Sequence, residues 1–178
     1  IPGEHNHGLV IPDWPVLVGI GEKVRYVADA IAIVAAETEE VAVKARDLIQ
    51  AEFEPLPVVS GPVQAKQAGQ PQIHQNGNML KHIKVRKGNV AAGFEESDIV
   101  LEHTFHTQTT DHMFMEPECS IAEPTEAGRL NVYVGSQIPY EDRSQIAEVL
   151  GWDESQVRII GQNMGGGFGG KEDIAGQI

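Results

Sequence analysis

The residues with the clearest chemical potential form a glycine-rich loop near the carboxyl end of this 178-residue chain. Five of the six residues from 165 to 170 are glycine, Phe168 is the sixth, and Lys171-Glu172 follows directly. Each glycine costs roughly 0.5–1 kcal/mol of backbone entropy relative to alanine, so such a run needs a physical reason. The usual reason is that bare backbone N–H groups approach an anionic or electron-rich ligand closely. The loop is therefore a candidate binding loop.

Two nucleotide-binding patterns fit the spacing of this loop. Gly165, Gly170 and Lys171 match the phosphate loop G-x-x-x-x-G-K, but Glu172 stands where a serine or threonine would hold magnesium. The loop also matches G-x-G-x-x-G, a match that glycine repetition makes almost automatic. The acidic residue that binds ribose about 20 positions after such a loop would fall beyond Ile178. A nucleotide-binding enzyme that uses this loop stays open as an alternative.

A β–α–β unit is predicted to position the loop together with a second polar segment, Gly135-Ser136-Gln137. Strand 130–134 precedes that segment, a helix begins at Pro139 and closes at Gly151, and strand 157–160 leads into the loop. If the two strands are parallel neighbours, their carboxyl ends meet at one sheet edge, where open α/β sheets bind ligands. Gln137 and Phe168 are thus expected to contact the same ligand.

Other elements follow from hydrophobic periodicity and turn residues. Thr38 is expected to cap a helix whose apolar face carries Val41, Ala42, Ala45, Leu48 and Ile49. Short helices are expected near 63–68 and 90–94, and strand 119–122 should pair with 130–134. Further strands are predicted at 16–18, 24–27, 30–36, 52–54, 99–107 and, followed by a turn, within 83–90. The fold class is α+β (mixed α/β), with a domain boundary that divides 1–75 from 76–178.

Composition narrows the classes of function. The formal net charge of −13 argues against nucleic acid and anionic membrane surfaces as partners, because both need clustered Lys and Arg. No apolar run approaches the roughly 18 residues of a membrane span. The single cysteine, Cys119, excludes an internal disulfide and an iron–sulfur or zinc site built on thiolates. A cytoplasmic protein of the globular class is expected.

Several stretches resemble the molybdenum hydroxylases, the xanthine dehydrogenase and aldehyde oxidase family. The nine residues Met-Gly-Gly-Gly-Phe-Gly-Gly-Lys-Glu at 164–172 look like that family's loop. Thr-Asp-His-Met-Phe-Met-Glu-Pro at 110–117 is similar to its Gln-Asp/Glu-His-Phe-Tyr-Leu-Glu-Pro stretch, with Thr110 in place of Gln. The resemblance implies a fragment of the catalytic subunit. It comprises a partial α/β hammerhead domain at 1–75, expected to lack its first half, and the first part of a molybdopterin-binding domain with a mixed sheet at 76–178.

The same resemblance implies a reaction and roles for particular residues. Such enzymes hydroxylate a purine, another heterocycle or an aldehyde with water-derived oxygen at a molybdenum–pterin centre. By analogy, Gln137 hydrogen-bonds an oxygen on molybdenum, and the Phe168 N–H donates to another. Gly167 and Gly169 let that amide approach, and Glu172 faces the substrate.

The resemblance also implies what lies outside this chain. No protein side chain here ligates the metal, and the general-base glutamate is expected downstream, so the fragment alone should be inactive and hold no cofactor. Iron–sulfur and FAD groups are expected in other domains or subunits, which would be its protein partners. A non-catalytic assembly module is the other alternative.

Overall fold

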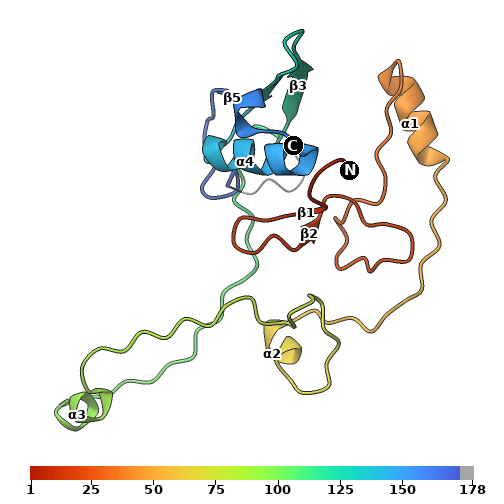
Figure 1. The fold of residues 1–178 in the computed structure, drawn as a ribbon. Helices are drawn as coiled ribbons and strands as arrows, with labels where there is room; N and C mark the ends of the chain where they lie inside the picture. The colour runs from red at the N-terminus through yellow and green to blue at the C-terminus, as the bar shows by residue number, and fades with distance from the viewer. Residues whose placement is uncertain (173–178) are drawn as a thin grey trace.

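The computed structural model describes residues 1–172, and its centre is a three-stranded sheet covered by one helix (Figure 1). The strands β3 (Ser120–Pro124), β4 (Leu130–Val134) and β5 (Val157–Gly161) lie in the order β3-β4-β5. β3 and β4 are antiparallel, whereas β4 and β5 are parallel and joined through α4 (Pro139–Leu150). The predicted hairpin and the predicted β–α–β unit are both confirmed.

Local sequence accounts for the limits of α4. Pro139 occupies its first turn, where the missing N–H has no helical acceptor to lose. Glu141 and Asp142 place negative charge in that turn, which the helix dipole favours. Gly151 ends the helix with φ 67°, a left-handed conformation that glycine adopts without strain. These signals made α4 predictable within a residue.

A small apolar core holds α4 against the two parallel strands. Its buried members come from both strands and from the middle of the helix: Val132, Val134, Ile146, Ala147 and Val157. Burying a valine or isoleucine side chain contributes about 1.5–3 kcal/mol. Leu150 is partly buried and packs against this core. The core therefore fixes the two strand ends from which the polar segments leave.

The amino-terminal residues form a hairpin that sequence analysis missed. β1 (Asn6–His7) pairs antiparallel with β2 (Trp14–Pro15), in a stretch for which no strand was predicted. Two backbone hydrogen bonds attach the preceding residues to the carboxyl end of α4: Gly3 N–H donates to Val149 O (2.9 Å) and Glu4 N–H donates to Glu148 O (2.9 Å). The hairpin thus lies against the central unit.

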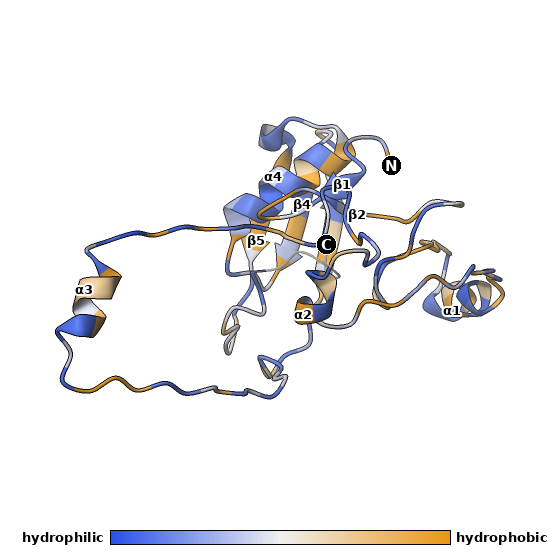
Figure 2. Ribbon diagram, turned by 90° about the horizontal axis from the view of Figure 1, so that it is seen from below, coloured by the Kyte–Doolittle hydropathy of each residue, from blue (hydrophilic) through white to orange (hydrophobic). Residues whose placement is uncertain are grey.

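Three helices lie away from this centre on extended segments (Figure 1). They are α1 (Glu39–Asp47), α2 (Pro62–Ala65) and α3 (Val90–Glu95), close to the predicted positions. Thr38 caps α1 as predicted, its Oγ1 accepting from Val41 N–H. However, α1 has no buried residue, so its predicted inward face is uncovered. Figure 2 shows α3 at the far end of a long excursion of the chain. No helix within residues 1–172 is long and apolar enough to cross a membrane.

The other predicted strands are wrong. Residues 16–18, 24–27, 30–36, 52–54, 83–90 and 99–107 contain no strand. Their apolar side chains are largely open to solvent, as the exposures of Ile33 (75%), Leu101 (81%) and Phe105 (86%) show. A strand needs a neighbour to pair with its backbone and cover its apolar face. No such neighbour stands beside these segments in the described part of the chain, which is a mixed α+β fold with small sheets.

Candidate functional site

The parallel strands bring Gln137 and the glycine loop together. β4 ends three residues before Gln137, and β5 ends shortly before the loop. The Gln137 N–H donates to the carbonyl oxygen of Lys171 at 3.0 Å, which ties the two segments through their backbones. The predicted meeting of these two segments at one sheet edge is therefore found. The cofactor-binding role assigned to them stays a prediction.

The side-chain amide of Gln137 is the hub of this meeting point. Its Oε1 accepts from the backbone N–H groups of Gly169 (3.2 Å) and Lys171 (3.3 Å). Its Nε2 donates to Glu172 Oε1 at 3.0 Å. A glutamine amide has two acceptor positions and two donors. The acceptor positions are thus filled, and one N–H of Gln137 has no acceptor among residues 1–172.

Two of the loop glycines, Gly167 and Gly170, are closely approached by side chains from outside the loop. A Cβ on Gly167 would lie 2.1 Å from Gln137 Oε1 and 2.7 Å from its Cδ. A Cβ on Gly170 would lie 2.5 Å from a ring carbon of Phe114 and 3.0 Å from the imidazole of His112. Real Cβ atoms do not approach other heavy atoms so closely. Glycine at 167 and 170 therefore lets the loop close over Gln137 and over the 112–114 segment.

Phe168 stands out by its backbone and by its unpaired amide. Its φ of 55° is left-handed, a conformation that costs energy in a residue with a Cβ, and the next residue, Gly169, has φ 92°. The Phe168 ring is 74% exposed. Within the described residues, the N–H groups of Gly166, Gly167 and Phe168 donate to no acceptor. Successive free N–H groups in a tight turn form a concave donor surface for anions or metal-bound oxygens.

An ion pair between the buried Lys171 and the partly exposed Glu116, which sequence analysis missed, supports the loop. Lys171 is 1% exposed, its Nζ lies 2.9 Å from Glu116 Oε1 and 4.7 Å from the centre of the Phe114 ring. The same Glu116 oxygen accepts from Gly165 N–H at 2.7 Å. The hydrogen bond from Lys171, followed by backbone N–H groups, lowers the pKa of Glu116 from 4.5 to about 2. The sequence offered one clue to this pair: Glu116 and Lys171 lie in the two stretches, 110–117 and 164–172, that resemble the molybdenum hydroxylases.

This pair gives a testable pH dependence. Because the folded pKa of Glu116 lies below its ordinary value, its contacts stabilise the loop fully above about pH 4.5 and are lost as pH falls through about 2. An NMR titration of the glutamate side-chain carbonyl carbons, with Glu116→Gln for assignment, should place the Glu116 midpoint near 2. Lys171→Met should move that midpoint up toward 4.5. A midpoint at the ordinary value in the unmodified protein would contradict the ion pair.

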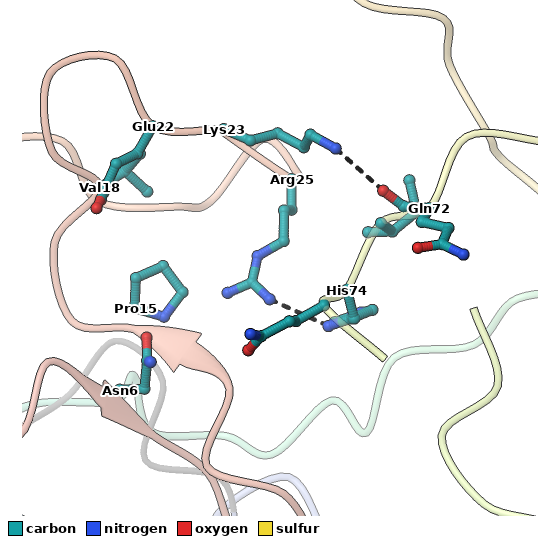
Figure 3. Close-up of a pocket in the computed structure, with 10 residues that line it drawn as sticks. Asn6, Pro15, Val18, Glu22, Lys23, Arg25, Gln72 and His74 are labelled. Carbon is teal, nitrogen blue, oxygen red and sulfur yellow. Dashed lines mark hydrogen bonds between the residues drawn. The ribbon is translucent and has the colours of Figure 1, made fainter. Parts of the chain in front are cut away.

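A second polar cluster lies apart from the loop and joins residues 13–25 to residues 72–75 (Figure 3). His74 Nδ1 lies 2.6 Å from Asp13 Oδ2 and 3.0 Å from Arg25 NH1, and Lys23 Nζ donates to Gln72 O at 3.0 Å. The contacts of Arg25 with His74 and of Lys23 with Gln72 cross between the two segments, so the cluster ties them together. Across residues 1–172, no group of three or more His, Cys, Asp or Glu side chains is placed to hold a metal ion.

Comparison with known proteins adds independent information. Residues 72–178 match the family described as the molybdopterin cofactor-binding domain. The chain is 42% identical over 174 residues to a Bacillus subtilis protein described as a probable subunit of xanthine dehydrogenase. It is 40% identical over 179 residues to the nicotinate dehydrogenase large molybdopterin subunit of Eubacterium barkeri. These alignments cover 98% and 99% of this chain but only 23% and 41% of the two relatives.

A third relative matches less closely but over most of the chain. The xanthine dehydrogenase molybdenum-binding subunit of Escherichia coli O157:H7 is 35% identical over 151 residues, which is 85% of this chain and 20% of that protein. The chain therefore spans a small part of each of these relatives. Since the domain family matches more than half of the chain and the relatives match nearly all of it, the chain belongs to the family of molybdopterin-binding subunits of xanthine dehydrogenases.

Proposed function

We propose that this chain is part of a xanthine dehydrogenase-like molybdenum hydroxylase and supplies one wall of its molybdopterin site. The observation that carries the proposal is the cradle at the ends of β4 and β5. There the Gln137 amide is held against the glycine loop, and the N–H groups of Gly166 to Phe168 donate to no acceptor within residues 1–172. Donors of this kind, held rigidly in place, suit oxygens that carry negative charge.

The residues of this cradle fit the cofactor's chemistry. The remaining Gln137 N–H and the Phe168 N–H would each donate to an oxygen of the molybdenum centre, while Gly167 and Gly169 add no side chain that would block access. When bound, the molybdenum–pterin group supplies two-electron redox chemistry that hydroxylates a carbon with oxygen from water. The protein's part here is to bind and orient, because none of these residues offers a side-chain ligand to the metal.

Glu172 is proposed to recognise the substrate. Its Oε1 accepts from Gln137 Nε2 at 3.0 Å, so the amide that would face the cofactor also orients this carboxylate. The other oxygen has no donor among the described residues, and Glu172 is an exposed residue. A carboxylate oxygen is a strong acceptor for the N–H of a purine or another heterocycle. An aldehyde without ring N–H groups would gain much less from it.

That difference predicts a substrate-dependent effect. In the full-length protein, Glu172→Ala should lower kcat/KM for a purine or similar heterocycle by about 10-fold or more and affect a simple aldehyde much less. Steady-state kinetics on both substrates, with molybdenum content measured in parallel, checks this. Glu118→Ala, which removes an exposed carboxylate, is the matched control and should change neither. Equal collapse on both substrates at full molybdenum content would move Glu172 to the chemical step.

The proposal includes the domain organisation and the electron-transfer partners of the full-length protein. We place a division between residues 1–75, as part of a hammerhead domain, and residues 76–178, as the start of the molybdopterin-binding domain. The strands missing from the first part would then pair with chain outside the described residues. Iron–sulfur and flavin domains or subunits would carry electrons onward, and the enzyme would work in the cytoplasm.

The proposal is tested on the full-length protein. Elemental analysis should find stoichiometric molybdenum, and turnover in ¹⁸O-labelled water with an artificial electron acceptor should place the label in a hydroxylated heterocycle or aldehyde product. A full-length protein that lacks molybdenum and binds magnesium-ATP tightly would replace the proposal with the nucleotide-binding alternative. Full activity that is insensitive to every change in the Gln137 cradle would instead make this chain an assembly module.

A further inference from the structure

We propose that Glu116 and Lys171 are positioning residues that lock the glycine loop in the shape which presents its free N–H groups. The identity of what those N–H groups bind rests on the proposed function. The lock itself is defined by contacts within this chain. Neither residue needs to touch cofactor or substrate, because each acts through the loop and through Gln137.

The first argument is that one carboxylate oxygen holds both ends of the loop. Glu116 Oε1 accepts from the backbone N–H of Gly165 at 2.7 Å and from Nζ of Lys171 at 2.9 Å. These two donors stand at the beginning and the end of the glycine-rich run. Fixing them from a single point closes the run into a ring, and this limits the freedom that five glycines would otherwise have.

The second argument is that Lys171 connects this anchor to Gln137. Its backbone N–H donates to Gln137 Oε1 at 3.3 Å, and its carbonyl oxygen accepts from Gln137 N–H at 3.0 Å. Its buried side chain crosses the Phe114 ring on its way to Glu116. A buried ammonium is costly without a partner, so losing Glu116 would expel Lys171 and release Gln137 with it.

The third argument is that the lock lies outside the core that stabilises the fold. Glu116 belongs to the segment before β3, and the apolar core is made by β4, α4 and β5. Among the described residues, two backbone hydrogen bonds within the loop add order: Gly170 N–H to Gly167 O and Glu172 N–H to Gly169 O. Loss of the ion pair should therefore loosen the loop and leave α4 as it is, which a general structural role would not do.

Hydrogen exchange on cofactor-free full-length protein tests the lock directly. Glu116→Gln and Lys171→Met should each raise exchange in peptides covering 162–172 by about 10-fold or more, with α4 unchanged. Hydrogen exchange in the double variant should be no faster than in either single variant, because each substitution already breaks the same ion pair. Lys171→Arg should restore most of the protection. Glu118→Gln and Lys44→Met, both at exposed positions, are matched controls and should behave like the unmodified protein.

Molybdenum content after loading with limiting cofactor gives the second readout, and it should fall several-fold in Glu116→Gln and Lys171→Met. Unchanged loop exchange would overturn the lock. So would equal acceleration in α4, or full molybdenum loading by a loosened loop. If exchange changes as expected but the unmodified protein takes up no molybdenum, the lock stands and the proposed function fails. The two failures are thus separable.

Discussion

Gly167→Ala in the full-length protein is expected to lower molybdenum retention and kcat/KM by about 100-fold or more while the sheet and α4 stay folded. The new Cβ would lie 2.1 Å from Gln137 Oε1 and 2.7 Å from Cδ. Because the Gln137 side chain is flexible, it would swing away, and this would relieve the clash at little cost to the fold. The amide would then lose its bonds to Gly169, Lys171 and Glu172.

Gly161→Ala is the matched control for this substitution. Gly161 ends β5, no atom lies within 4 Å of where its Cβ would stand, and its φ is not left-handed. Molybdenum content, steady-state kinetics and Tm should be measured on both variants. The control should match the unmodified protein in all three. Full activity in Gly167→Ala would show that binding does not depend on the contact between Gln137 and the loop.

The central unit could be predicted because its signals are local. Pro139 and Gly151 mark the ends of α4, and a short apolar run stands on either side of it. A strand, a helix of this length and a second strand favour a parallel pair, and that pairing alone places Gln137 beside the loop. The meeting of Gln137 and the loop at one sheet edge is thus a consequence of topology that the sequence alone predicts.

The outlying segments could not be predicted in the same way. An apolar strand pattern shows which side chains a strand would bury, but it does not show which other segment would cover them. Residues 30–36 form the strongest apolar run of the chain. They are joined to the 16–18 segment by a backbone hydrogen bond from Val18 N–H to Ala30 O, and they do not form a strand with it. Strand pairing depends on a neighbouring strand, and the sequence pattern of one segment does not identify that neighbour. The apolar face of α1 is uncovered for the same reason.

Some features of the site are visible in the sequence, whereas others depend on contacts that only the fold creates. The glycines are visible in the sequence, but the reasons for Gly167 and Gly170 are side chains from 137 and 112–114 that reach them in space. Glu116 and Lys171 are 55 residues apart, and nothing in their spacing pairs them. The bond between Gln137 and Glu172 also appeared only with the fold, and it joins two residues that resemblance had assigned to different ligands.

Gln137→Ala is expected to lower kcat/KM of the full-length protein by about 10- to 150-fold, since a hydrogen bond to a charged oxygen contributes roughly 1.5–3 kcal/mol. The substitution also removes the acceptor that braces Gly169 and Lys171, so it does not by itself separate donation from bracing. Gln75→Ala, at an exposed position outside the cradle, is the control and should leave activity unchanged.

Gln137→Glu combined with Glu172→Gln separates the two roles. The carboxylate at 137 can still accept from the Gly169 and Lys171 N–H groups, and the amide at 172 can donate back to it, so the brace is kept without opposing two carboxylates. The N–H that Gln137 would offer to the cofactor is lost. If donation matters, this double variant should keep the loop's protection from hydrogen exchange and the unmodified Tm, yet lose activity as Gln137→Ala does, on an aldehyde as well as on a heterocycle. Recovery of activity on the aldehyde would show that Gln137 only braces the loop, and the donor role proposed for its amide would be wrong.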